Sequence, residues 1–167
     1  MSTYSNNKIL IYGGGGIGSY YAGALSKNGH NVTLLTRGNH FEKIKKNGLK
    51  LKTNWGNFTQ KINLVREIDA EYDVVILAVK TYSVKTILSD LKLLKKGSKI
   101  ICIQNGTYTY NYLSEHLKDL GVNVIDGLTW IDALRKDEGS VIQTGDEAKI
   151  IFGKNNILDS EKLELNR

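Results

Sequence analysis

The sequence predicts a single α/β domain built around a mostly parallel sheet. Three observations lead to this prediction. Short runs rich in β-branched residues alternate with longer amphipathic runs, as in successive strand–helix–strand units. The first short apolar run is followed directly by four glycines and then by a helical pattern. The 167 residues contain no proline, no repeat and no low-complexity linker that would divide the chain.

The N-terminal half is expected to begin with a strand over residues 8–12 and a helix over residues 17–27. Gly29 ends this helix, since glycine is favoured just beyond a helix terminus. A second strand covers residues 31–36, and a short basic helix covers residues 40–46. Strands at 48–52 and 58–64 flank a predicted Gly56–Asn57 turn.

The unbroken apolar run at residues 73–79 predicts a central parallel strand that is covered on both faces. After it come helices at 84–94 and 108–117 and strands at 99–104 and 123–129. Two late strands, at 140–144 and 149–152, are expected to pair antiparallel around Gly145 and Asp146. We therefore expect residues 1–154 to form the domain. Residues 155–167 are expected to be a polar tail with weak helical character, at the start of a second domain.

The composition limits the classes of function. Lysine and arginine number 23 against 17 acidic residues, but the positive charges are spread along the chain, so we expect no nucleic-acid partner. No apolar run approaches the roughly 18 residues that span a membrane, and the polar N-terminus is no signal peptide. We therefore expect a cytoplasmic protein with no membrane association.

The metal-binding residue types are few and scattered. The single cysteine, Cys102, is expected to be a buried strand thiol, which excludes an internal disulfide and a cysteine-based zinc site. His30, His40 and His116 are far apart in the sequence, and each is expected on the surface. We predict no metal site.

The glycine-rich segment, from Gly13 to Gly18, satisfies the pattern G-x-G-x-x-G. Gly13 permits the tight turn out of the strand, Gly15 lets a pyrophosphate approach the backbone, and Gly18 lets helix and strand pack closely. The free N–H groups at the start of the following helix favour anions. With an apolar strand before it and an amphipathic helix after it, this segment predicts a dinucleotide site in a Rossmann-like, doubly wound fold.

The end of the second strand favours NADP(H) over NAD(H). NAD sites place an acidic residue there to accept a hydrogen bond from the ribose 2′-hydroxyl, whereas an arginine suits a 2′-phosphate. This sequence has Arg37 at that point and no acidic residue before Glu42. A guanidinium can pair with a phosphate through two parallel hydrogen bonds.

Four motifs follow one another along the chain. The first runs from the glycine loop through Gly-His to a strand that ends in Arg37, and the second is Lys80, directly after a strand. The third is Gln104-Asn105-Gly106 after the next strand, and the fourth consists of Gly127-Leu-Thr129, Ala133 and a Glu-Gly-Ser-Val turn. In this order they resemble the motifs of the ketopantoate reductase (2-dehydropantoate 2-reductase) family, and the resemblance covers residues 8 to 154.

The resemblance implies a role for each matching residue. Gly13, Gly15, Gly16, Ile17 and Gly18 would hold the pyrophosphate. Arg37 and Lys80 would hold the 2′-phosphate of NADPH. Asn105 would reach the nicotinamide ribose and the substrate, and Ala133 would lie beside the nicotinamide through its backbone. From position alone, Lys80 and Asn105 follow parallel strands at the carboxyl edge, where open α/β sheets bind ligands.

The resemblance also implies an activity: NADPH-dependent reduction of 2-dehydropantoate to pantoate, a step of pantothenate and coenzyme A biosynthesis. In that family a second, helical domain supplies a catalytic lysine and most substrate contacts, and this sequence stops at Arg167, where that domain would start. We therefore expect no catalytic residue within these 167 residues and no activity without a second domain to help bind the 2-keto acid.

Two other functions remain open. The chain is alternatively a truncated, non-catalytic NADP-binding module, or the cofactor domain of another 2-hydroxyacid or opine-type dehydrogenase. In the family, the helical domain would normally cover part of this domain's surface. We therefore expect the isolated chain to expose an apolar patch there and to hide it by forming a homodimer.

Overall fold

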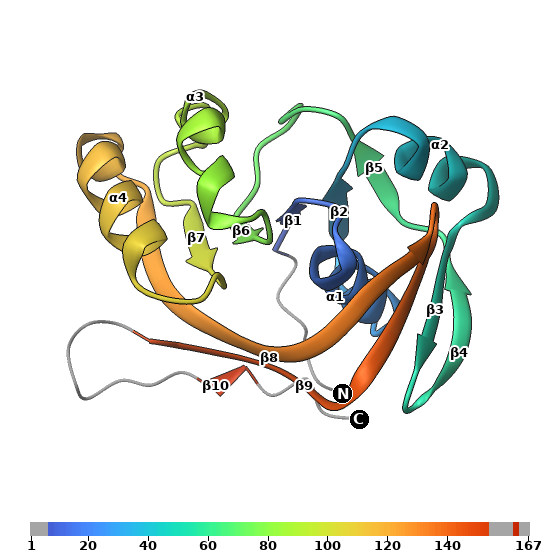
Figure 1. Ribbon diagram of the computed structural model, residues 1–167. Coiled ribbons are helices and arrows are strands. Elements are labelled where there is room, and N and C mark those ends of the chain that lie inside the picture. Colours follow the sequence, from blue (N-terminus) through green and yellow to red (C-terminus); the bar gives the residue numbers. More distant parts are fainter. Residues whose placement is uncertain (1–6, 154–161, 164–167) are drawn as a thin grey trace.

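The computed structural model describes residues 7–153 and 162–163. Its strands form one sheet in the order β4-β3-β9-β8-β7-β6-β1-β2-β5, with β10 beside β9 (Figure 1). The strands are β1 (Ile9–Tyr12), β2 (Val32–Leu35), β3 (Leu49–Thr53), β4 (Gly56–Gln60), β5 (Asn63–Val65), β6 (Val74–Leu77), β7 (Lys99–Cys102), β8 (Asn123–Asp137), β9 (Ser140–Gly153) and β10 (Lys162–Leu163). The helices are α1 (Gly16–Lys27), α2 (Gly38–Asn47), α3 (Leu88–Leu91) and α4 (Tyr108–Leu117), with 3₁₀ turns η1 (Thr81–Ser83), η2 (Lys85–Ile87) and η3 (Lys118–Leu120).

The central part of the sheet is parallel and covered on both faces, as predicted. Every neighbouring pair from β8 through β7, β6, β1 and β2 to β5 is parallel. Leu10, Ile11 and Tyr12 are all buried, and they alternate between two cores. One core lies under α1 and contains Ile11, whereas the other lies under α3 and α4 and contains Leu10 and Tyr12. This confirms the Rossmann-like, mostly parallel arrangement.

The C-terminal strands differ from the prediction. Strand β8 continues to Asp137, and β9 is one long strand that pairs antiparallel with β8. The two late strands therefore do not pair with each other around Gly145 and Asp146. Those residues fall in a break in the register, between the Ile131–Ala148 and Ala133–Gln143 pairs. The glycine signal thus marks a bulge rather than a turn.

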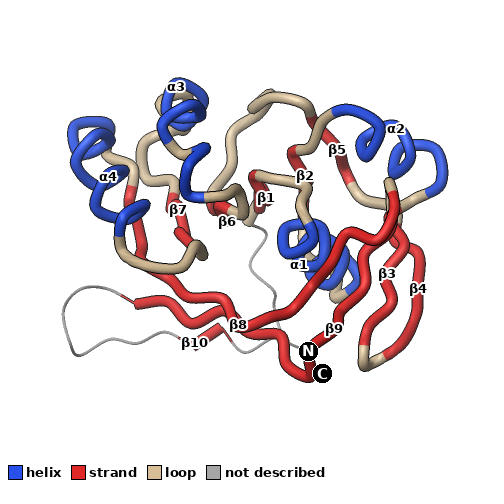
Figure 2. Tube along the Cα trace, viewed as in Figure 1, coloured by secondary structure: helices blue, strands red, loops and turns tan. Residues whose placement is uncertain are grey.

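The pair β8–β9 forms a curved ribbon that passes over α1 (Figures 1 and 2). Strand β9 also pairs in parallel with β3, so the ribbon connects the parallel sheet to the β3–β4 hairpin. Helix α1 is consequently enclosed, with Tyr21 and Ala22 fully buried. Tyr21 fixes the helix to the ribbon, because its hydroxyl lies 2.6 Å from Thr129 Oγ1 and donates to the Lys149 carbonyl at 3.1 Å.

The predicted helix at 84–94 is present only in pieces. The chain forms η1 and η2 and then only one α-helical turn, α3. Ile87 N–H donates to the Val84 carbonyl, an i→i−3 bond, and the Thr86 hydroxyl donates to the Ser83 carbonyl at 2.7 Å. Such side-chain bonds compete with the α-helical pattern, and β-branched residues weaken it further.

Three smaller predictions also need correction. The strand expected at 58–64 is divided between β4 and β5, and β5 crosses to the far edge of the sheet to pair with β2. Gly56 is the first residue of β4, so the turn precedes it, at residues 54–55. The expected polar tail lies mostly outside the described residues. Lys162 and Leu163 pair with β9 as a strand, not a helix.

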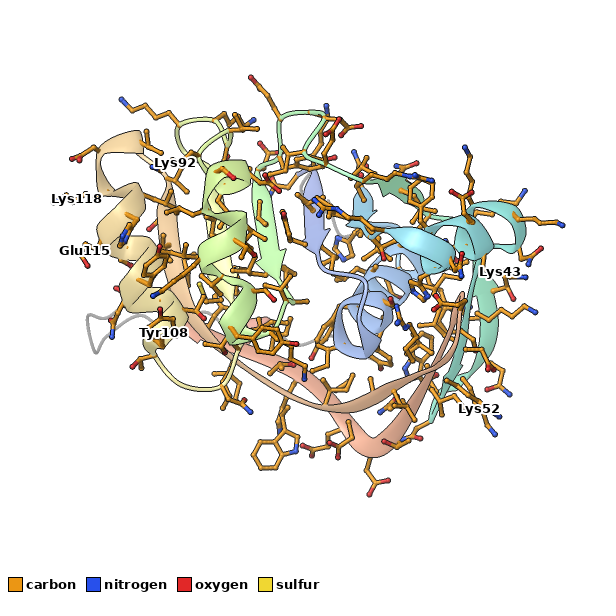
Figure 3. The ribbon with its side chains drawn as sticks, turned by 45° about the horizontal axis from the view of Figure 1, so that its top comes forward. Lys43, Lys52, Lys92, Tyr108, Glu115 and Lys118 are labelled. Carbon is orange, nitrogen blue, oxygen red and sulfur yellow. The ribbon has the colours of Figure 1, made fainter. Side chains whose placement is uncertain are left out.

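Charged side chains extend from both ends of the molecule. Figure 3 shows Lys92, Glu115 and Lys118 at the end that carries α3 and α4, with Lys43 and Lys52 at the opposite end. No helix within the described part of the chain is long and apolar enough to cross a membrane.

Candidate functional site

The turn between β1 and α1 brings the backbone closer to its neighbours than any side chain would allow. Gly13 has a φ of +118°, a conformation that residues with a Cβ rarely adopt. A Cβ on Gly18 would lie 1.9 Å from the Gly13 carbonyl oxygen and 3.0 Å from Ala78 Cβ. Gly13 therefore makes the turn and Gly18 permits the contact between helix and strand, as the sequence predicted.

Two further glycines in this turn are fixed by contacts that the motif did not reveal. A Cβ on Gly14 would lie 2.1 Å from Thr36 Oγ1, at the end of β2. A Cβ on Gly16 would lie 2.3 Å from the carbonyl oxygen of Ala133 in β8. The ribbon therefore brings the Ala133 carbonyl against the start of α1. The place beside the nicotinamide that the resemblance implies for the Ala133 backbone stays a prediction.

Gly15 is different, because a Cβ added to it would meet nothing within 4 Å. It is exposed and occupies the N-cap of α1, with no side-chain hydrogen bond to the helix and no acidic residue in the first turn. The first N–H groups of a helix need external partners, and they favour anions. The open backbone at Gly15 therefore fits a phosphate-bearing ligand.

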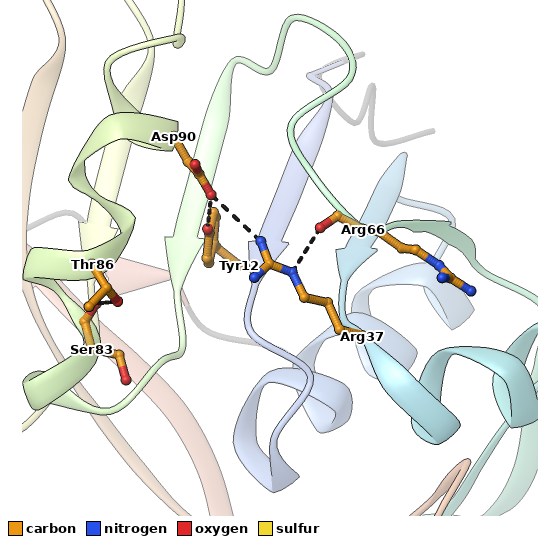
Figure 4. Close-up of polar contacts among 6 residues, drawn as sticks. All are labelled: Tyr12, Arg37, Arg66, Ser83, Thr86 and Asp90. Carbon is orange, nitrogen blue, oxygen red and sulfur yellow. Dashed lines mark hydrogen bonds and ion pairs between the residues drawn. The ribbon is translucent and has the colours of Figure 1, made fainter.

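Arg37 follows β2 at the same edge of the sheet, and its guanidinium extends towards the end of β1 (Figure 4). Its Nε donates to the Arg66 carbonyl at 3.0 Å, and one terminal nitrogen lies 3.8 Å from Asp90 Oδ2. Two-thirds of the side chain, 66%, is exposed. The guanidinium is thus oriented by the loop after β5 but keeps donors for a ligand.

Lys80 and Asn105 follow β6 and β7, and both are exposed at the carboxyl edge. Gln104, just before Asn105, is buried and donates through Nε2 to the carbonyls of Leu77 and Val79, at 2.9 and 3.0 Å. Its amide thus fixes the backbone that leads into Lys80. Gln104 belongs to one of the four motifs, but no role of its own was predicted for it. The sequence did not predict that its side chain would be buried.

His40 was expected on the surface, and that prediction is wrong: its side chain is fully buried. Its Nδ1 accepts a hydrogen bond from Gly139 N–H at 2.9 Å, and its Nε2 lies 3.0 Å from Ser19 Oγ. Burial, followed by the charge of Arg135, lowers the pKa of His40. His40 therefore connects α2, α1 and the turn of the ribbon as a neutral side chain.

Cys102 is buried in β7, as expected, and burial raises the pKa of its thiol to about 12. A thiol with so high a pKa is a poor nucleophile at neutral pH. Among the described residues, no three or more His, Cys, Asp and Glu side chains are grouped so as to hold a metal ion. The chemistry available at the edge is thus that of backbone N–H groups, two cations, an amide and the carboxylate of Asp90.

Comparison with known proteins agrees with this geometry. Residues 9–156 match the family model described as ketopantoate reductase PanE/ApbA. A 2-dehydropantoate 2-reductase of Pyrococcus horikoshii is 33% identical over 167 residues, which cover 96% of this chain and 53% of that protein. The crystal structure of a 2-dehydropantoate 2-reductase from Geobacter metallireducens aligns with a TM-score of 0.79 at 27% identity, over 88% of this chain and 49% of that one.

A second similar structure is the ternary structure of a D-mandelate dehydrogenase with NADH and anilino(oxo)acetate. It aligns with a TM-score of 0.71 at 26% identity, over 86% of this chain and 47% of that one. The chain spans about half the length of the curated relatives it matches. From the family match and these alignments, the chain belongs to the ketopantoate reductase family of oxidoreductases.

Proposed function

We propose that this chain forms the NADPH-binding part of a reductase that acts on a small 2-keto acid, with 2-dehydropantoate as the preferred substrate. The observation that carries the proposal is the contrast within the glycine turn. Gly13, Gly14, Gly16 and Gly18 are closed in by neighbouring atoms, while Gly15 alone leaves open backbone at the start of α1. Arg37 and Lys80 provide positive charge at the same edge of the sheet.

Each residue of the site has a part in holding the nucleotide. The backbone from Gly13 to Gly18 would receive the pyrophosphate, and Arg37 and Lys80 the 2′-phosphate. Asn105 would contact the nicotinamide ribose and the substrate, and the Ala133 backbone would border the nicotinamide. When bound, a reduced nicotinamide supplies the hydride that a ketone carbon accepts.

Reduction of the ketone also needs a proton at the carbonyl oxygen. We assign that proton donor to none of the 167 residues. The resemblance assigns the proton donor to a lysine in the second domain of the family. The role that we propose for Lys80 is to bind the 2′-phosphate. This chain's own contribution is therefore to bind and orient the cofactor.

Titration with NADPH and NADH, followed by nucleotide fluorescence, tests the cofactor assignment. We expect Arg37→Ala and Lys80→Ala each to weaken NADPH binding roughly ten- to a hundredfold, as expected for loss of a charge-assisted hydrogen bond, and to affect NADH far less. Lys52→Ala removes an exposed cation of β3, outside the residues assigned to the site, and should leave both affinities unchanged. Failure of the wild type to bind either nucleotide would refute the proposal.

A second candidate substrate class is favoured by the similarity to the D-mandelate dehydrogenase. Because the proton donor is assigned to the second domain of the family, the assay is run with that domain supplied. It compares 2-dehydropantoate with a phenyl-substituted 2-keto acid as the acceptor, which distinguishes the two substrate classes. Oxidation of NADPH by the first compound supports a ketopantoate reductase, and preference for the second supports a different 2-hydroxyacid dehydrogenase. Tight binding of NADPH without turnover of either compound supports the non-catalytic module.

A further inference from the structure

We propose that Asp90 is a specificity-determining residue of the nucleotide site: its carboxylate reduces the preference for a nucleotide with a 2′-phosphate over one with a free 2′-hydroxyl. The inference rests on the proposed function, because it assumes that Arg37 marks the ribose 2′ position. Asp90 lies in α3, far from the glycine turn and from Arg37 in the sequence. The fold brings it to the carboxyl end of β1, next to Arg37 (Figure 4).

The carboxylate of Asp90 is held in place by Tyr12, the last residue of β1. The Tyr12 hydroxyl donates to Asp90 Oδ2 at 2.5 Å, and the tyrosine is only 3% exposed. Burial, followed by the hydrogen bond to Asp90, raises the pKa of Tyr12 above its ordinary value, so the phenol remains a donor at neutral pH. Asp90 is therefore a fixed feature of this edge, not a freely rotating surface side chain.

Arg37 and Asp90 approach each other without forming a close hydrogen bond. The distance of 3.8 Å between their charged atoms exceeds the range of a hydrogen bond. The guanidinium is instead anchored through Nε to the Arg66 carbonyl at 3.0 Å. Arg37 therefore does not depend on Asp90 for its orientation, and its terminal nitrogens can still pair with a ligand.

Two opposite charges thus lie at the position that distinguishes the two nucleotides. A phosphomonoester carries about −1.5 to −2 charge at neutral pH. It would gain from Arg37 but would be repelled by Asp90. A ribose 2′-hydroxyl is a neutral donor, and a carboxylate is a good acceptor for it, as in NAD sites. Asp90 therefore lowers the affinity for NADPH and supports that for NADH.

The test is the Asp90→Asn variant, which keeps the shape of the side chain and an oxygen to accept from Tyr12. The probes are NADPH and NADH, together with adenosine 2′,5′-bisphosphate and AMP, which report on the adenosine end alone. We expect the ratio of NADPH to NADH affinity, and that of bisphosphate to AMP, to rise roughly three- to tenfold at low salt. The rise should shrink at high ionic strength because the charges are exposed.

Asp119→Asn serves as the matched control, because it removes the same charge from an exposed residue of η3 and should leave both ratios unchanged. An unchanged ratio in Asp90→Asn would overturn the proposal. A lower ratio would also overturn it, and would mean that Asp90 orients Arg37 for the phosphate. If the wild type binds none of the four probes, the proposed function itself fails, whereas binding with unaltered selectivity in Asp90→Asn refutes only the role of Asp90.

Discussion

Two regions lie at the same edge of the sheet, yet they are built in different ways. One is the glycine turn, Gly13–Gly18, and the other is a charged rim formed by Arg37 and Asp90. In the turn, backbone atoms meet backbone atoms: Gly18 faces the Gly13 carbonyl, and Gly16 faces that of Ala133. In the rim, Arg37 and Asp90 are partly exposed side chains separated by 3.8 Å. The turn is thus fixed by steric exclusion, and the rim by weak electrostatics.

This difference predicts how each region responds to mutation. Packed backbone cannot move to admit an extra atom, so substitutions in the turn should mainly lower the free energy of unfolding. Exposed charges contribute little to stability, so substitutions in the rim should be expressed mainly as altered ligand preference. A protein of this kind can therefore change its nucleotide preference through the rim while the turn stays constant.

The largest expected effect is that of Gly18→Ala. The new Cβ would lie 1.9 Å from a backbone oxygen and would force β1 and α1 apart, so we expect the free energy of unfolding to fall by about 3 kcal/mol. Gly15→Ala is the matched control in the same turn. Its Cβ meets nothing, and its φ of −73° suits alanine, so stability should change by only about 0.5 kcal/mol while NADPH binding weakens.

Urea-induced unfolding of both variants, with NADPH titration of Gly15→Ala, makes the measurement. Equal losses of stability in the two would mean that the turn as a whole is tightly packed, and the contrast with the rim would then lose its basis. Undiminished NADPH binding in Gly15→Ala would show that the open backbone at this position is not where the pyrophosphate lies.

The sequence predicted only in part why each position of the turn must be glycine. The roles of Gly13 and Gly18 follow from their places in the motif, because both contacts are local to the strand–turn–helix unit. The constraints on Gly14 and Gly16 come from Thr36 and Ala133, which only the tertiary fold brings there. No short-range pattern encodes such contacts.

The parallel core was predictable for a similar reason, since strands buried on both faces produce continuous apolar runs. The ribbon of β8 and β9 was not predictable in this way. Beyond Thr129, β8 alternates exposed and half-buried residues and contains charges, so it produces no continuous apolar run. His40 was misjudged on the same ground. A histidine in a basic segment looks solvent-exposed until the ribbon turn closes over it and provides Gly139 as a partner.

An intermediate effect is expected from His40, which connects the turn to the ribbon. Its folded-state pKa is lowered by burial, so between that value and its unfolded value of about 6.5 the unfolded chain binds more protons. Stability from this group is therefore complete above about pH 6.5 and is lost as the pH falls, by up to about 1.4 kcal/mol per pH unit. His40→Gln should remove this component of the pH dependence.

Urea unfolding of the wild type and His40→Gln between about pH 7 and about pH 5 tests the assignment. Glu138→Gln provides a second comparison, because Glu138 Oε2 lies 3.4 Å from His40 Nδ1 and raises the pKa of His40. Without that carboxylate the folded pKa should fall further, so the loss of stability should extend to lower pH. Parallel curves for the wild type and His40→Gln would show that the buried histidine is not linked to pH.

The smallest effect is expected from the ion pair in the rim. Arg37 and Asp90 are 66% and 31% exposed in their side chains and are 3.8 Å apart, so their coupling should be at most about 0.5 kcal/mol and should vanish at high salt. A double-mutant cycle of Arg37→Ala and Asp90→Asn in urea measures it. A coupling above about 2 kcal/mol would be typical of a buried pair and would give the rim the rigidity of the turn. Arg37 would then be committed to Asp90, and a 2′-phosphate would have to break that pair before it could bind. A weak coupling leaves the guanidinium free to pair with the ligand. Substitutions of Arg37 or Asp90 can then change the nucleotide preference without lowering the stability of the fold.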